Sequence, residues 1–494
     1  MFKYRILTLI LITVLLLSTV GCSSKTDDAY IYFELPSTPV TLDPQTASSD
    51  AELLIVRNIY EGLMRKNDKG EVVTGAAEEY QKNDLSYIFT LREDIFWSNG
   101  EKLTAKDFVF GLIRAVDPQT QAPFASRLLC IQNAGEIANG RLSPEKLGVR
   151  ALSDRKILIN LEYDDKDFLE NLTTSVAMPC NEKFFEKSAG KYGLFKDKII
   201  CNGSYRLSKW NKESFGIRLY KNEEYNGGFK ARNAAVFLTC NHDEDVTQKL
   251  SDNHIDIAFI NVALTKDMES KGFKTDSFQN ICWVMTLSSD FSYNMRTALL
   301  KLVGNEVYGK SLKRGYSNAN SLFPKIFDGA ANSNGYTAYD LESGKDYYSN
   351  EVKQLDDSKF PSDITLYYYD NGFIKPIVTD IVGHWQSNLS AFVNIEAVDN
   401  LQGLLPQLKE QTLSMAIFPV RADSKNSAEY LKNYTDDYEN TNFTAIQENI
   451  LSSKNITPLF FEETALCYSP TITEVFINED NGFIDFAFVI KQEN

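Results

Sequence analysis

The chain has 494 residues and a formal net charge of −16, because 67 acidic residues outnumber 51 basic ones. The sequence contains no basic patch of the kind that neutralises phosphates, so we expect no nucleic-acid partner. The length predicts several core units, although no internal repeat or low-complexity linker marks their boundaries.

The N-terminus has the pattern of a secretion signal. Lys3 and Arg5 precede an apolar run over residues 6–20, which is shorter than the roughly 20 residues needed for a membrane-spanning helix. Gly21-Cys22 ends the run as bacterial lipoprotein signals end, where the cysteine is acylated and becomes the first mature residue. We expect residues 1–21 to be removed, which takes the net charge from −16 to −18, and residues 22–29 to form a polar tether. An ordinary signal cleaved nearby is the alternative.

A helix is predicted soon after this tether. Thr41-Leu42-Asp43-Pro44 precedes residues 52–65, in which apolar side chains recur at helical spacing. These side chains are Leu53, Val56, Ile59, Tyr60 and Leu63. The helix is therefore expected to bury one face.

A strand and a hairpin follow. Tyr87, Phe89 and Leu91 alternate with polar neighbours, as a strand with one buried face requires. Asn99-Gly100 readily takes the positive φ angles of a tight turn, which predicts a hairpin between residues 96–97 and 102–103.

The next helix has a clear start and end. Thr104 and Asp107 are spaced to satisfy the free N–H groups of its first turn, and it should end near Asp117-Pro118. The apolar side chains that share one side are Phe108, Val109, Leu112, Ile113 and Val116.

Further along the chain, the sequence predicts a turn and a strand, and later a strand, a helix and a second strand. Asn202-Gly203 predicts a turn, Tyr205 and Trp210 are expected to be core aromatics, and alternation over residues 215–219 predicts a strand. Residues 364–369, 376–389 and 393–395 then give strand, helix and strand with a short return. This is a βαβ unit, which we expect on a mostly parallel sheet.

Residues 87–118, YIFTLREDIFWSNGEKLTAKDFVFGLIRAVDP, resemble the signature of family 5 solute-binding proteins of bacterial ABC importers, the oligopeptide and dipeptide receptors. The family also writes TLDP and YEGL, as residues 41–44 and 60–63 do, and LGV-A-SD-ILINL matches residues 147–161. Residues 202–227 are similar to its NGPY and N--YW motifs. The resemblance is strong to about Asp256 and loose beyond it.

This resemblance implies an α/β fold of the two-lobed periplasmic-binding-protein type (type II, cluster C), with a small extra domain inserted in the N-terminal lobe. The small domain is expected at residues 71–197, and the C-terminal lobe, shortened and diverged, at 279–465. The N-terminal lobe is expected at residues 30–70 and 198–278, completed by 466–494.

The implied function is capture of a peptide in a cleft between the lobes and its delivery to an ABC permease with its ATPase. The receptor would be a monomer with no cofactor, metal or catalytic residue. A lipid on Cys22 would hold it at the outer face of the cytoplasmic membrane, which is the periplasmic side in a Gram-negative cell.

The resemblance implies four ligand-binding residues. Asp423, in the Ala422-Asp423 pair, stands where peptide receptors hold the ligand α-amino group, although a solvated loop aspartate is the alternative. Phe124 stands for a tyrosine that reaches the ligand, and Trp283 and Met285, on the presumed linking strand, line the cleft or pack in the core. A glutamate of relatives is replaced by Thr38.

Three alternatives stay open. The solute is a nickel complex, haem or an oligosaccharide, although three histidines argue mildly against a metal complex. A peptide sensor without transport is a second possibility. The third is a serine acyl enzyme: two SxxK patterns begin at Ser143 and Ser153, and SDN begins at Ser251, but the glycine of the third mark is missing before Lys274-Thr275.

Besides Cys22, six cysteines are scattered along the chain: Cys130, Cys180, Cys201, Cys240, Cys282 and Cys467. None forms a short-spaced metal pair. Their even number permits disulfides outside the cytoplasm, and buried free thiols are an equal expectation.

Overall fold

The computed structural model describes most of the chain after residue 28. The described residues are 29–211, 216–240, 245–312, 315–325, 327, 333–354, 364–370, 372–398, 413–422, 430, 434, 443–477 and 483–492. They fall into two compact units. Unit 1 is Met1–Ala258, Tyr468–Ile477 and Phe483–Asn494, and unit 2 is Phe259–Cys467 and Asn478–Gly482.

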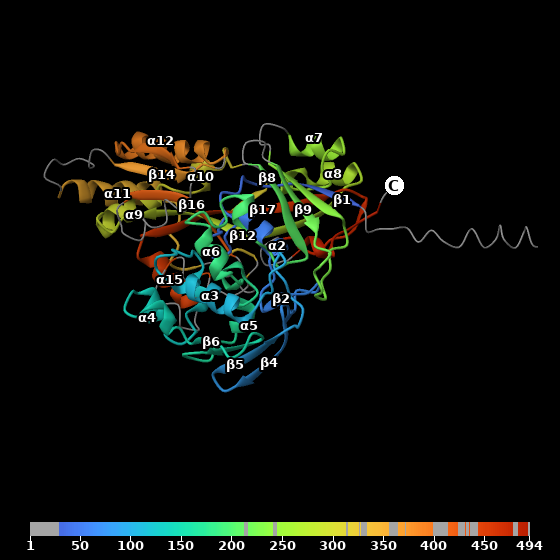
Figure 1. Cartoon of the computed structure of the whole chain (residues 1–494). Coiled ribbons are helices and arrows are strands. Elements are labelled where there is room, and N and C mark those ends of the chain that lie inside the picture. Colours follow the sequence, from blue (N-terminus) through green and yellow to red (C-terminus); the bar gives the residue numbers. More distant parts are fainter. Residues whose placement is uncertain are drawn as a thin grey trace, which may run out of the picture. The chain divides into compact units, whose positions relative to one another are not determined.

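Unit 1 is built on a mixed sheet (Figure 1). The strands lie in the order β11-β1-β10-β9-β8, with β1 parallel to β10 and β11, and β9 antiparallel to both of its neighbours. Their bounds are β1 Tyr30–Glu34, β8 Tyr205–Asn211, β9 Gly216–Lys221, β10 Ala235–Thr239 and β11 Ile257–Asn261.

Helix α2 is shorter than the sequence predicts. It spans Asp50–Ile59, where Ser49 and Glu52 form a capping box, and Tyr60 is already extended. The predicted continuation to residue 65 is wrong, because the side chain of Asn202 bonds both the N–H and the C=O of Glu61 and replaces the helical partners. A two-stranded ribbon follows, of β2 Met64–Lys66 and β3 Val72–Thr74.

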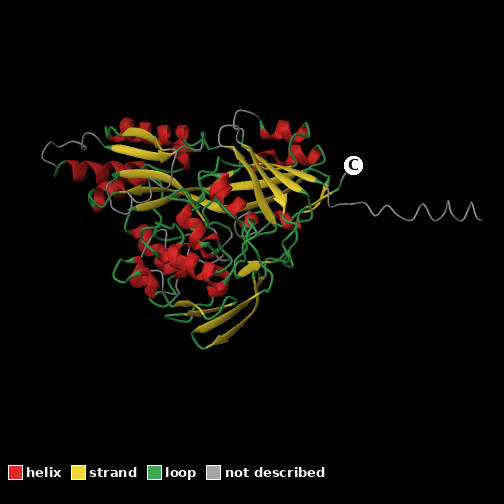
Figure 2. Cartoon of the chain, in the orientation of Figure 1, coloured by secondary structure: helices red, strands yellow, loops and turns green. Residues whose placement is uncertain are grey.

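A small antiparallel sheet contains the first strand of the family signature, and helix α3 (Ala105–Val116), also in the signature, packs against it (Figure 2). The predicted alternating strand, the turn at Asn99-Gly100 and the helix end at Asp117 are confirmed. Gly100 has φ +84°, and Asp107 accepts from the N–H and hydroxyl of Thr104 at 2.7 and 3.1 Å. The strands run in the order β4 Ala77–Asn83, β5 Ser86–Leu91, β7 Lys156–Asn160 and β6 Val149–Ala151.

Unit 2 contains the strands β15-β14-β16-β12-β17, hydrogen-bonded in that order, with β13 paired to β17. The predicted βαβ unit is confirmed: β14 and β15 are parallel and helix α12, Lys375–Leu389, connects them. The expectation of a mostly parallel sheet is wrong for this unit, since β12 and β16 are antiparallel, as are β13 and β17. The strands are β12 Lys274–Leu287, β13 Tyr316–Asn318, β14 Thr365–Tyr369, β15 Asn394–Val398, β16 Met415–Arg421 and β17 Ile456–Tyr468.

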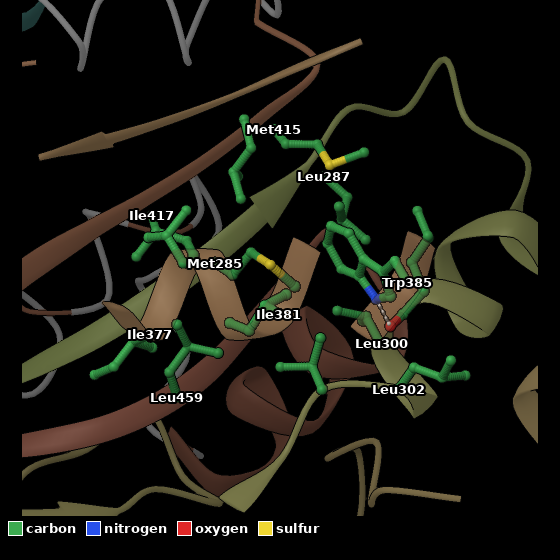
Figure 3. Close-up of a cluster of buried hydrophobic side chains, with 14 of the residues drawn as sticks. Met285, Leu287, Leu300, Leu302, Ile377, Ile381, Trp385, Met415, Ile417 and Leu459 are labelled. Atoms are coloured by element: carbon green, nitrogen blue, oxygen red, sulfur yellow. Dashed lines mark hydrogen bonds between the residues drawn. The ribbon is translucent and has the colours of Figure 1, made fainter. Parts of the chain in front are cut away.

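The core of unit 2 lies between this sheet and α12 (Figure 3). Ile377, Ile381 and Trp385, one helical turn apart, face the β12 side chains Met285 and Leu287. The Trp385 indole donates to the carbonyl of Leu299 at 2.9 Å, so its only polar atom is satisfied inside the core. Further helices of the unit are α9 Tyr293–Lys301, α11 Leu341–Val352 and α15 Phe443–Ser452.

Within the described residues, no helix combines the length and the apolar composition that a membrane crossing would require.

Candidate ligand-binding site

Asp43 of the TLDP motif in unit 1 forms a buried ion pair. Arg114 of α3 donates to both carboxylate oxygens of Asp43, at 3.2 and 2.7 Å, and to Gln45 at 2.6 Å. Burial lowers the pKa of Arg114, but the hydrogen bonds and charge of Asp43 outweigh it, so the pKa is raised. Gln45 in turn donates to the carbonyl of Met178 at 2.9 Å. The motif therefore joins the segment before α2 to helix α3 and to the backbone at Met178.

A second buried cluster surrounds Glu61. Its carboxylate accepts from Arg65 at 3.3 Å, from Arg92 at 2.5 Å and from the hydroxyl of Tyr225. Asn202 bonds the Glu61 backbone on both sides. A Cβ at Gly203 would lie 2.7 Å from the Ile59 carbonyl carbon, so this approach needs glycine. Three stretches of the family pattern thus meet in one structural network.

The predicted amine-binding Asp423 lies outside the described residues. The structure does describe the strand that leads to it. β16 pairs with β12 so that Arg421 faces Ile281, and the Ala422 N–H donates to the Asn280 carbonyl at 2.8 Å. The two residues before Asp423 are therefore positioned by backbone pairing with β12. The role of Asp423 itself stays a prediction.

The same strand pair contains a residue that sequence reasoning missed. The Asn280 side chain is 1% exposed, and within the described part of the chain neither its oxygen nor its nitrogen has a hydrogen-bond partner. An amide buried in this way costs about 1–3 kcal/mol for each unpaired group. Nothing in the sequence around Asn280 signals this, because the cost arises only when strands β12 and β16 pair.

Trp283 and Met285 are core residues in unit 2, with exposed fractions of 1% and 0%. The Trp283 ring stacks on Phe460 at 5.7 Å, and its indole donates to Glu462 at 2.7 Å. Both side chains belong to a buried hydrophobic cluster, as one of the two interpretations of the sequence expects, and their ligand role stays a prediction.

Phe124 is half-buried and directly precedes the 3₁₀ turn Ala125–Leu128. The Arg127 guanidinium lies 5.7 Å from its ring centre. Thr38, which replaces a glutamate of relatives, donates its hydroxyl to the Cys240 sulfur at 3.4 Å. The ligand role of Phe124 stays a prediction.

Comparisons with known proteins agree with this architecture. A profile of the bacterial extracellular solute-binding proteins, family 5, matches residues 71–442, which is more than half of the 494 residues. The chain belongs to this family.

Several relatives of this family 5 protein are peptide-binding proteins by name, whereas Escherichia coli YgiS, 35% identical over 35% of this chain, is named a probable deoxycholate-binding periplasmic protein. The oligopeptide-binding protein OppA of Bacillus subtilis is 26% identical over 422 residues, which cover 80% of this chain and 77% of OppA. The dipeptide-binding protein of Lactococcus lactis is 32% identical over 42% of this chain. This match and one to the murein peptide-binding protein MppA of Escherichia coli span only 38% and 41% of those relatives.

Solved structures show the same fold. Listeria monocytogenes OppA bound to peptide has a TM-score of 0.80 at 20% identity, covering 94% of this chain and 100% of that one. The Escherichia coli murein tripeptide binding protein MppA has a TM-score of 0.77 at 20% identity, over 94% of this chain and 99% of that one.

The six described cysteines of the family 5 protein are buried free thiols, as one of the two expectations held. Cys282 faces Val420 across the strand pair, so it meets no second sulfur there. Burial raises the pKa of the Cys180 and Cys201 thiols to about 12, which keeps both protonated.

The serines of the acyl-enzyme patterns have local roles. The Ser251 hydroxyl donates to the Thr247 carbonyl at 2.7 Å within helix α7 (Val246–Ser251). Ser153 accepts from the N–H groups of Arg155 and Lys156 in a turn. Among the histidines, His384 contacts Tyr339 and Asn388, and burial lowers its pKa.

Proposed function

We propose that this family 5 protein is a lipid-anchored receptor that captures peptides outside the cytoplasmic membrane and passes them to an ABC permease. One observation carries the proposal: family membership comes with a fold that matches the peptide-bound OppA of Listeria monocytogenes over 94% of the chain. Relatives named for peptide binding, in Bacillus subtilis and Lactococcus lactis, support the same solute class.

Binding would use the ligand main chain. A free peptide brings a cationic α-amino group, which must find an anion when it leaves water, and Asp423 is the candidate. Asn280, close to the same strand end, offers an NH₂ donor group and a carbonyl acceptor, which are complementary to the C=O and N–H of a peptide unit. Recognition of these main-chain groups leaves the ligand side chains free to vary.

The peptide would be held in the cleft when the two lobes close over it. A ligand shifts the equilibrium toward the form that it binds more tightly, so the difference between its affinities for the open and closed forms determines the population of the closed form. No covalent step is part of the proposal, and the permease and ATPase would receive the unchanged peptide.

The test is to identify and then titrate the solute. Mass spectrometry of whatever co-purifies with the mature protein should find peptides, and adding a found peptide at about 100 times its Kd should stabilise the protein by about 2.7 kcal/mol. A co-purifying nickel complex, haem or sugar would replace the peptide proposal with another solute. A covalent adduct with a reactive β-lactam would revive the enzyme alternative.

A further inference from the structure

One face of the unit 1 sheet exposes large aromatic side chains. Tyr30 and Tyr32 of β1 are 46% and 40% exposed, whereas Ile31 and Phe33, which point to the other side, are fully buried. Monomeric proteins rarely expose aromatic side chains in a group without a use for them. This use is separate from the candidate ligand-binding residues, which lie on other elements.

Strand register extends the face across four strands. Tyr32, Phe237, Arg218 and Lys209 pair in turn from β1 to β8, so their side chains share one side of the sheet. A second row places three more side chains on the same side: Tyr30, Tyr220 and Arg206. We call the side chains of these two rows, with Lys491, the aromatic face.

The aromatic rings and cations of this face contact one another. Phe237 lies 5.4 Å from Tyr30 and 5.1 Å from Tyr32, measured between ring centres. The Arg218 guanidinium lies 5.2 Å from the Phe237 ring, and the Lys491 ammonium 5.5 Å from Tyr32. The Arg218 contact holds that cation over the ring, whereas the Lys491 ammonium is also paired with the Asp256 carboxylate at 2.8 Å.

The charge of the aromatic face is opposite to that of the chain. The two described rows carry three cations and no carboxylate, in a protein with a net charge of −16. The next outward residue of β1, Glu34, is buried and paired with Lys249 of helix α7 at 3.0 Å. The short helix thus contacts the end of β1, while Tyr30 at the start of the strand is exposed.

We propose that the aromatic face lies against the anionic headgroups of the membrane that anchors the chain. Tyrosine rings settle at the level of lipid headgroups, and each Lys or Arg near an anionic surface strengthens association roughly fivefold. The inference rests on the lipid anchor of the proposed function. From Cys22 to Tyr30 the chain can span at most about 29 Å, which keeps the face near the bilayer.

The tether also makes weak association measurable, because it holds the local concentration of membrane surface high. The experiment places a thiol on the acylated, full mature chain: Lys209→Cys reports the aromatic face, and Lys187→Cys reports an exposed position on helix α6 (Glu182–Lys187). The described native cysteines are buried, so they do not compete for a water-soluble maleimide.

The protein is anchored in vesicles with or without phosphatidylglycerol in a phosphatidylcholine background. We expect the Lys209→Cys thiol to react at least about threefold more slowly on anionic vesicles, and the Lys187→Cys thiol to react equally on both. Adding Arg206→Gln with Arg218→Gln should restore the rate. The matched pair Lys183→Gln with Lys191→Gln, which removes the same charge elsewhere in unit 1, should not.

Equal rates for the Lys209→Cys thiol on the two kinds of vesicle would overturn the proposal. Slowing that requires a co-reconstituted permease would also overturn it, because the face would then be a protein-docking surface. Peptide titration of the same variants in solution tests the receptor function independently. The mass of the N-terminal peptide tests the lipid anchor independently. Failure of the receptor or of the anchor is therefore distinguishable from failure of this inference.

Discussion

Asp43, Glu61 and Asn202 carry much of the family pattern, and all three are buried in networks that join distant parts of unit 1. Burying a charged side chain costs free energy unless the charge is paired. The identities of these residues are therefore determined by folding. The family signature therefore predicts how the chain folds better than it predicts which peptide the protein takes.

Asp423→Asn tests the amine site at the residue scale. Loss of the carboxylate charge should weaken a peptide with a free N-terminus by about 2 kcal/mol, roughly thirtyfold in Kd, because a charge-assisted hydrogen bond is lost. The N-acetylated form of the same peptide should bind both proteins equally. Calorimetric titration measures both, and an equal loss for the two peptides would remove Asp423 from this role.

Asn280→Leu separates stability from binding. Replacing a buried amide without partners by an apolar side chain of similar size should stabilise the ligand-free protein by about 1–3 kcal/mol in urea unfolding. It should also weaken peptide binding, since the ligand loses its partner. Asn202→Leu is the matched control and should destabilise, because both of its amide groups are bonded. Unchanged affinity in Asn280→Leu would show that Asn280 does not contact the ligand.

At the scale of elements, local sequence patterns predicted a helix correctly where the tertiary contacts of that helix agree with the pattern. The cap at Thr104 and the apolar spacing that follows predicted helix α3, and apolar spacing over residues 376–389 predicted α12, because each helix buries its apolar face. The end of α2 was not predictable from its own residues. Asn202, 141 positions from Glu61, bonds the Glu61 backbone and so stops the helix at Ile59.

Arg114→Met tests the junction between α3 and the TLDP segment. The substitution leaves Asp43 buried without its cation, which should destabilise unit 1 by about 3–5 kcal/mol in urea unfolding. Adding Asp43→Leu should recover part of this loss, because the uncompensated charge is removed. If the double variant is no more stable than Arg114→Met, the pair does not determine the stability of the junction.

At the scale of the whole molecule, the sequence predicted the α/β class and the family but not the sites that depend on assembly. The buried amide of Asn280 and the aromatic face each form only when strands that are far apart in the chain pair with one another. Periodicity shows which side of a strand is buried, yet it cannot show what the other side meets.

Alkaline pH should destabilise the folded chain as a whole. The Cys180 and Cys201 thiols have folded-state pKa values of about 12, above the ordinary 9.0. The folded state therefore keeps protons that the unfolded state loses, and stability is full below pH 9 and falls as the pH rises toward 12. Urea unfolding at pH 8, 9.5 and 10.5 measures this. Cys180→Ala with Cys201→Ala should flatten the decline, and an unchanged slope would exclude the thiols as its cause.

The last prediction concerns how the molecule is held in place. If Cys22 is acylated, each buried methylene contributes about 0.8 kcal/mol to membrane binding, so the mature protein should fractionate with membranes and its N-terminal peptide should carry the lipid mass. Cys22→Ser should release the protein or leave it unprocessed, with peptide affinity unchanged. A wild-type protein that is found free, with an unmodified N-terminus near residue 22, would instead identify an ordinary secretion signal. The anchor matters beyond location, because only a tethered chain can hold the aromatic face of β1 at a lipid surface that it would otherwise meet rarely.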